Sequence, residues 1–86
     1  MLEKADELGR LIRSARLAKR IRQRDLAQYL GIHKSQLWRY EAGMVVPSIL
    51  IFRDICERLK LDFDQYVRLW VDAKLEMEDD INAQRA

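Results

Sequence analysis

The apolar residues of the chain recur at helical spacing in five successive stretches, separated by short polar or glycine-containing breaks. Helices are predicted over about residues 6–20, 23–30, 34–41, 49–60 and 63–81. Gly31 suits the left-handed conformation that ends a helix, and Ser48 suits the N-cap of the fourth helix. Asp62 and Gln65 form a capping-box pattern before the fifth. No stretch alternates with the period of a strand, so the pattern predicts an all-α fold.

Each predicted helix has one apolar face that can enter a common core. In the first helix this face comprises Leu8, Leu11, Ile12 and Ala15, continued by Leu17 or Lys19. The second and third helices contribute Leu26, Ala27, Leu30, Leu37 and Tyr40, joined by Ile32 between them. The fourth contributes Ile49, Phe52, Ile55, Cys56 and Leu59. These positions predict one domain over residues 1–86, with its core at about 8–70.

The fifth helix is too long for a domain of this size, at roughly 28 Å over its predicted length. Its apolar stripe continues past residue 70, so a C-terminal extension of about 71–82 needs another surface to cover it. We expect a homodimer whose contact includes Tyr66, Trp70, Val71, Leu75 and Met77. In the alternative, only 63–70 completes the local core and the acidic residues after Leu75 fray into solvent.

Composition narrows the class of protein. The chain has 86 residues, 49% of them apolar and 35% charged, which is typical of a helix-rich globular domain. No apolar run is long enough to span a membrane, and the opening residues lack the pattern of a secretory signal, so we expect a cytoplasmic protein. A single cysteine and a single histidine leave no cluster for a metal and no nucleophile–base pair. We therefore expect no metal, no cofactor, no evident small-molecule ligand and no enzymatic activity.

Charge is distributed unevenly along the chain. Residues 1–47 hold ten basic and five acidic side chains, a net charge of +5, whereas residues 48–86 hold six and nine, a net charge of -3. Between Arg10 and Arg24 there are seven basic side chains and no acidic one. Such a run can be an ordinary solvated helix face, but it also suits a polyanion. Its position directly before the helix pair 23–41 favours the polyanion.

That pair, two short helices hinged at Gly31, has the spacing of a helix-turn-helix, the usual device by which small proteins read double-stranded DNA. With one face of the second helix in the core, its outer face carries Lys34, Ser35, Trp38 and Arg39. Lys and Arg can donate hydrogen bonds to guanine O6 and N7. The indole of Trp38 can meet a thymine methyl or a sugar, or can instead pack against neighbouring helices.

Over about residues 8–70 the sequence resembles the lambda-repressor-like, Cro/C1-type (XRE) helix-turn-helix regulators of bacteria and phages. The shared elements are Arg16, the segment QRDLA at 23–27, Leu30-Gly31-Ile32, Arg39 to Gly43, Pro47-Ser48 and the junction 59–63. The resemblance implies a five-helix domain in which Arg16 pairs with Glu41. Two independent surface charges are the alternative. His33, Arg20 and Ala42 depart from the residues common in relatives.

The resemblance also implies roles at the DNA. Base contacts would come from the positions of Lys34, Ser35 and Arg39, to which Trp38 is added here. The resemblance places Gln23 at a backbone phosphate, and we expect Arg22, His33, Gln36 and Lys19 to contact the backbone as well. Together these features predict a homodimeric repressor that binds an inverted-repeat operator. The alternative is a protein-interaction module of the same fold, an antitoxin or anti-activator, that uses the long fifth helix to bind a second protein.

Overall fold

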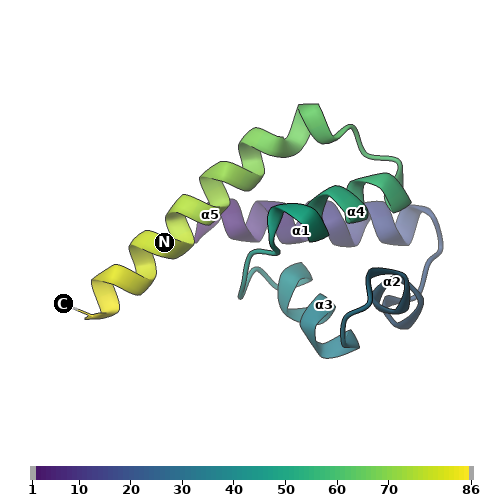
Figure 1. The fold of residues 1–86 in the computed structure, drawn as a ribbon, viewed down its shortest axis with the longest axis horizontal. Coiled ribbons are helices and arrows are strands. Elements are labelled where there is room, and N and C mark those ends of the chain that lie inside the picture. Colours follow the sequence, from purple (N-terminus) through teal and green to yellow (C-terminus); the bar gives the residue numbers. More distant parts are fainter. Residues whose placement is uncertain (1, 86) are drawn as a thin grey trace.

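The computed structural model describes residues 2–85, and this part of the chain forms five helices and no strand (Figure 1). The helices are α1 (Glu3–Ala18), α2 (Gln23–Leu30), α3 (Lys34–Glu41), α4 (Ile49–Leu59) and α5 (Phe63–Arg85). The predicted all-α, five-helix fold is confirmed. α1 begins three residues earlier than predicted, and α5 continues as helix four residues beyond its predicted end.

Local signals account for three of the helix ends. Gly31 closes α2 with φ of 70°, a left-handed conformation that costs glycine little. The Ser48 hydroxyl accepts a hydrogen bond from the Ile51 backbone N–H at 3.2 Å and caps α4. The Asp62 carboxylate accepts one from the Asp64 N–H at 3.1 Å at the start of α5. These caps fix where the chain turns between helices.

The core lies between α1, α4 and the helix pair α2–α3. Its fully buried side chains include Leu8, Ile12, Leu26, Leu37, Phe52 and Ile55. Three predicted core positions are wrong. Leu17 and Lys19 are exposed because the buried side chain of Arg16 takes the inward position in the last turn of α1. Ile49 is exposed in the first turn of α4. The core therefore does not extend to the last turn of α1 or to the first turn of α4, contrary to what the apolar pattern had predicted.

α5 crosses α1 obliquely in Figure 1, packs against it and contributes to the same core. Ala73 is fully buried, and the Trp70 indole N–H donates to the Pro47 carbonyl at 2.8 Å. Tyr66, Trp70 and Met77, which were expected at a dimer contact, lie partly buried against the chain's own core. At 100° per residue these three side chains share the side of α5 that buries Ala73, which turns them toward this core. Of the five predicted dimerisation residues, only Val71 and Leu75 stay exposed, at 40% and 54%.

The far end of α5 is tied to the start of the chain. The Glu76 carboxylate accepts a hydrogen bond from the Lys4 backbone N–H at 2.7 Å. Leu2, at the N-cap of α1, offers no side-chain hydrogen bond, so Glu76, 72 positions from Lys4, supplies the missing acceptor. A carboxylate in this place also suits the positive end of the helix dipole.

None of the helices in residues 2–85 combines the length and the apolar character that a membrane-spanning segment requires.

Candidate nucleic-acid interface

α2 and α3 form a compact pair joined by the turn at Gly31. The Gly31 N–H donates to the Gln28 carbonyl at 3.2 Å, and the Ile32 N–H donates to the Ala27 carbonyl at 3.0 Å. These two bonds satisfy carbonyls at the end of α2 and turn the chain sharply into α3. Leu26, Leu30, Leu37 and Tyr40 face inward, so the opposite side of α3 is left to solvent.

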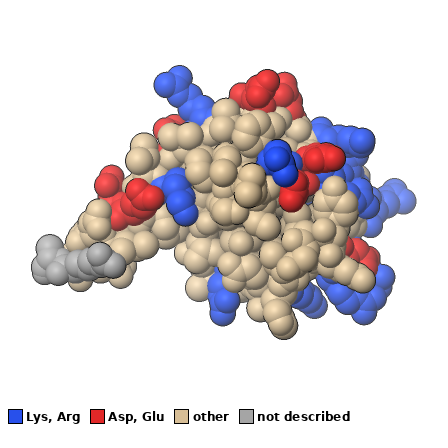
Figure 2. All heavy atoms as spheres, viewed as in Figure 1, with Lys and Arg blue, Asp and Glu red and all other residues tan. Residues whose placement is uncertain are grey.

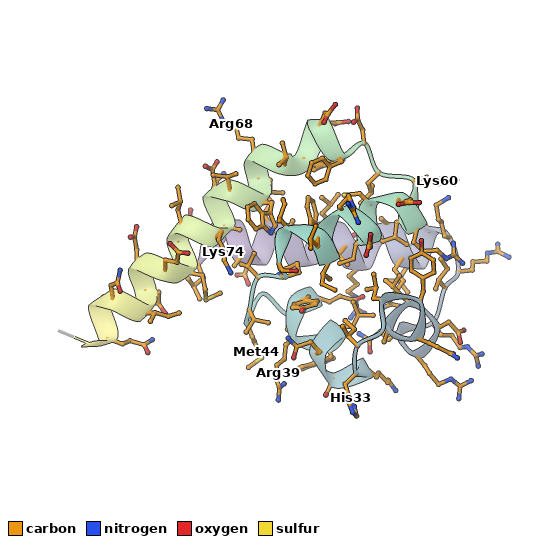
Figure 3. All side chains as sticks on the ribbon, in the orientation of Figure 1. His33, Arg39, Met44, Lys60, Arg68 and Lys74 are labelled. Carbon is orange, nitrogen blue, oxygen red and sulfur yellow. The ribbon has the colours of Figure 1, made fainter. Side chains whose placement is uncertain are left out.

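The outer face of α3 carries the four predicted base-contacting residues. Lys34, Ser35, Trp38 and Arg39 are all exposed. Figure 3 shows Arg39 and His33 projecting from the same edge of the molecule, away from the other helices. Trp38 is 51% exposed, so it is not buried between helices as one reading of the sequence allowed. Gln36 is partly buried, and its amide donates to the Tyr40 hydroxyl at 3.2 Å.

A basic hollow adjoins this face, between α1, the start of α2 and the start of α3. Its volume is about 610 Å³ and it opens to solvent. Its lining residues are Arg13, Arg16, Arg22, Gln23, Arg24, Lys34 and Trp38. In the view of Figure 2, Lys and Arg side chains crowd the end where α1 joins α2, whereas acidic side chains lie along α5. A groove with this lining suits a chain of phosphates.

Arg13 and Arg24 line the hollow but were not singled out from the sequence. The run of seven basic residues contained both, so the signal was present. The run alone does not show which of the seven basic side chains turn toward α3. Lys19, a predicted backbone contact, is exposed but does not line the hollow.

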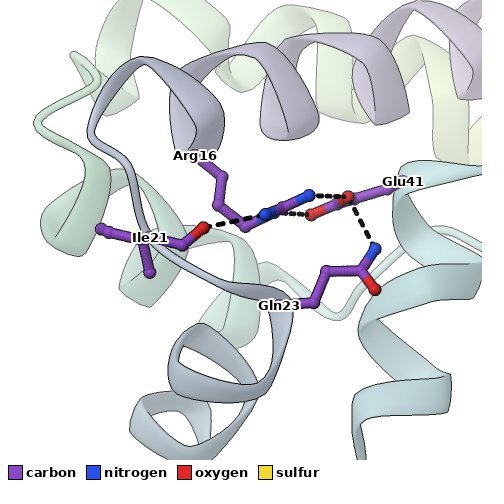
Figure 4. A network of polar contacts seen from close by, with 4 residues as sticks. All are labelled: Arg16, Ile21, Gln23 and Glu41. Carbon is purple, nitrogen blue, oxygen red and sulfur yellow. Dashed lines mark hydrogen bonds and ion pairs between the residues drawn. The ribbon is translucent and has the colours of Figure 1, made fainter.

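A buried network fixes the two walls of the hollow relative to each other (Figure 4). Arg16 Nε donates to Glu41 Oε2 at 2.7 Å and Arg16 Nη2 donates to Glu41 Oε1 at 3.0 Å, a two-pronged ion pair. Arg16 Nη1 also donates to the Ile21 carbonyl at 2.8 Å. The Arg16 and Glu41 side chains are only 7% and 3% exposed. The network therefore ties α1 and the α1–α2 turn to the end of α3.

Gln23 joins the same network at the first residue of α2. Its amide nitrogen donates to Glu41 Oε1 at 2.9 Å. An amide nitrogen carries two hydrogens, so one remains for an acceptor in the hollow. Arg22, its neighbour, forms an exposed ion pair with Asp25 at 2.8 Å and can exchange that partner for another anion.

Close packing of α1 against α3 sets the depth at which α3 sits. A Cβ built on Gly9 would lie 2.5 Å from the Glu41 carbonyl oxygen and 2.6 Å from that of Tyr40. Only glycine admits this approach. Gly9 could not be singled out from the sequence, because a glycine inside a helical pattern carries no sign of what it touches.

Within the described residues no three His, Cys, Asp or Glu side chains gather as metal ligands. Burial, with a smaller contribution from the Asp62 carboxylate, raises the pKa of the Cys56 thiol to about 11. Cys56 is therefore a neutral thiol near pH 7 and packs as a small apolar side chain.

Two short helices joined at a left-handed glycine, with a basic outer face and an adjoining basic hollow, define a helix-turn-helix DNA-binding domain. Comparison with known families agrees, because the family model described as a helix-turn-helix domain matches residues 7–69. The chain belongs to this family of DNA-binding domains. A search of curated proteins gave no match.

Proposed function

We propose that the chain is a sequence-specific transcriptional regulator of the lambda-repressor-like, Cro/C1 type, a cytoplasmic homodimeric repressor that needs no cofactor. The observation that carries this proposal is the exposed face of α3 beside a hollow lined by five cationic side chains. Such a surface meets both requirements of DNA recognition, because phosphate contacts fix the position of a protein and base contacts select the sequence. Repression would follow from occupancy of the operator.

The side chains divide by their place on α3. At 100° per residue, Ser35 and Arg39 lie near the middle of the exposed face, opposite Leu37. Arg39 would donate to guanine O6 and N7 in the major groove, with Ser35 as a permissive neighbour. Lys34 and Trp38 lie at the edge that borders the hollow and would meet bases next to the phosphate strand. Arg22, Gln23, Lys19, His33 and Gln36, together with Arg13 and Arg24, would contact the backbone.

Selection from a random duplex library at about 150 mM salt tests the proposal, because non-specific binding is weakened there. A homodimer would enrich an inverted repeat whose half-sites are centred about 34 Å apart, one turn of the DNA. Bound DNA without a common motif would contradict sequence-specific recognition. A single unpaired half-site at saturating protein would contradict the dimer.

We expect Arg39→Ala to weaken binding to the selected operator by roughly 10- to 200-fold and binding to random DNA much less. The reason is that a base contact adds affinity only where the right base is present. Lys60→Asn is the matched control, since it removes one positive charge on the edge of the molecule away from Arg39 (Figure 3). Titration of both DNAs with each variant measures the effect. An equal loss on operator and random DNA would assign Arg39 to the phosphate backbone.

A protein-interaction module remains the second candidate, and the exposed Val71 and Leu75 on α5 favour it. A module of this kind would capture a second protein through α5. It would leave the DNA selection without an enriched motif, whereas an antitoxin that also represses its own promoter would enrich one.

A further inference from the structure

The turn between α1 and α2 holds an arginine where the backbone conformation favours glycine. Arg20 has φ of 57°, a left-handed conformation that is costly for a residue with a β-carbon. Backbone bonds close this turn. The Arg20 N–H donates to the Leu17 carbonyl at 2.9 Å, and the next N–H along, of Ile21, donates to the Arg16 carbonyl at 3.1 Å. Glycine would make the same bonds without the strain, so the Arg20 side chain is not needed to close the turn.

The same side chain adds a positive charge beside the basic hollow. Arg20 is exposed and takes part in no ion pair among residues 2–85. Its turn is fixed to the buried network, because Arg16 Nη1 donates to the Ile21 carbonyl at 2.8 Å. Arg22, two residues further along, lines the hollow. Figure 2 shows Lys and Arg side chains crowding this end of the molecule, so Arg20 extends the basic surface past the hollow from a backbone that is held in place.

We propose that Arg20 binds a backbone phosphate of DNA next to the phosphates that the hollow accepts. This inference rests on the DNA binding of the proposed function and adds a contact that neither the hollow nor α3 supplies. A guanidinium can donate two parallel hydrogen bonds to one phosphate. The backbone of a duplex carries a phosphate at every nucleotide, so the strand that enters the hollow continues beyond it. Strained backbone conformations cluster at ligand-binding positions, and this contact gives the strain at Arg20 a function.

Lys60 separates a role in DNA binding from a role in the fold. It has φ of 60° at the C-cap of α4, and its turn is closed by the corresponding bond, from the Leu61 N–H to the Cys56 carbonyl at 2.9 Å. Both Arg20 and Lys60 place a cation at the carboxyl end of a helix, where the helix dipole favours positive charge. Figure 3 shows Lys60 on the edge of the molecule away from Arg39. A purely structural role would therefore be common to both residues, whereas the phosphate contact belongs to Arg20 alone.

The salt dependence of DNA binding tests the contact. Arg20→Asn and Lys60→Asn each remove one cation, and asparagine tolerates the left-handed conformation, so both turns are kept. In fluorescence titrations of random duplex DNA at about 50 to 200 mM salt, Arg20→Asn should lower the slope of log affinity against log salt by about 1. Affinity near 0.1 M salt should fall roughly 5- to 10-fold, for random DNA and the selected operator alike. Lys60→Asn should change neither the slope nor the affinity appreciably, and thermal denaturation verifies that both variants fold.

Two further measurements identify the contact as a phosphate. Arg20→Lys should retain most of the slope, because lysine keeps the charge. Uncharged methylphosphonate linkages, placed one at a time in the selected operator, should include a linkage in each half-site that weakens binding of the original chain but not of the Arg20→Asn chain. Such non-additive losses show that the side chain and that phosphate interact.

The outcomes separate this inference from the proposed function. If Arg20→Asn changes the slope and the affinity no more than Lys60→Asn does, Arg20 is only a cation at a helix end, and the proposed regulator stands without it. A loss confined to the operator would make Arg20 a base contact and overturn the phosphate contact, as would methylphosphonate losses that are the same for both chains at every linkage. An original chain that binds neither random DNA nor any selected sequence would overturn the proposed function and this contact together.

Discussion

Arg16→Ala should lower the free energy of unfolding by about 3–5 kcal/mol, because it leaves the Glu41 carboxylate buried without its cation. Arg16 makes three hydrogen bonds, two to Glu41 and one to the Ile21 carbonyl, and all of them are lost at once. A domain of this size has little stability to spare, so the variant should be partly unfolded near 37 °C. Urea denaturation followed by circular dichroism measures the change.

Arg22→Ala is the matched control, since it breaks the exposed pair with Asp25 and should cost under about 1 kcal/mol. A chain carrying both Arg16→Met and Glu41→Leu should recover much of the lost stability, because no charge is then left unpaired in the interior. Should Arg16→Ala cost no more than Arg22→Ala, the buried network would not hold α1 and α3 together.

Gly9→Ala should destabilise the domain by about 3 kcal/mol, the effect of forcing extra atoms into a filled space. The direction matters here, because inside an unobstructed helix the same change should stabilise by roughly 1 kcal/mol. The added Cβ would meet two backbone carbonyl oxygens of α3, and neither can move without the helix. We therefore also expect weaker operator binding from the folded fraction, since α3 must shift relative to the hollow.

Gly31→Ala is the control for Gly9→Ala. A Cβ on Gly31 would meet nothing within 4 Å, so only its φ of 70° is unfavourable to alanine. That cost is about 1–2 kcal/mol. Thermal or urea denaturation of both variants measures the difference, and a Gly9→Ala chain as stable as the original would show that α1 and α3 are not in contact at this point.

Features that depend on residues close together in the sequence were predicted accurately, whereas features that depend on distant residues were not. The bounds of α2 and α3 were predicted to the residue, because Gly31 and the apolar spacing around it act within one turn. The start of α1 was missed, because its capping acceptor is Glu76, far away in the sequence. A pattern of local residues contains no sign of such a partner.

The same reasoning applies to the candidate site. The exposed face of α3 follows from helical spacing once Leu37 and Tyr40 are placed in the core, so its residues could be named in advance. The hollow depends on how α1 crosses α3, which Gly9 and the Arg16 network determine. The apolar stripe on α5 was recognised from the sequence, but its buried and exposed parts were not told apart. Only the packing of α5 on the core distinguishes Trp70 and Met77 from the exposed Val71 and Leu75.

The hydrogen bond between Glu76 and Lys4 has a consequence for how the chain folds during its synthesis. The helix pair α2–α3 lies in the first half of the sequence and packs on α1. α1 in turn is capped and partly covered by α5, at the end of the sequence. A nascent chain that has emerged only as far as α4 lacks both the Glu76 cap and the surface that covers one side of α1. Folding on the ribosome should therefore be postponed until α5 has left the exit tunnel, and a contact that spans 72 residues makes the final step the slow one.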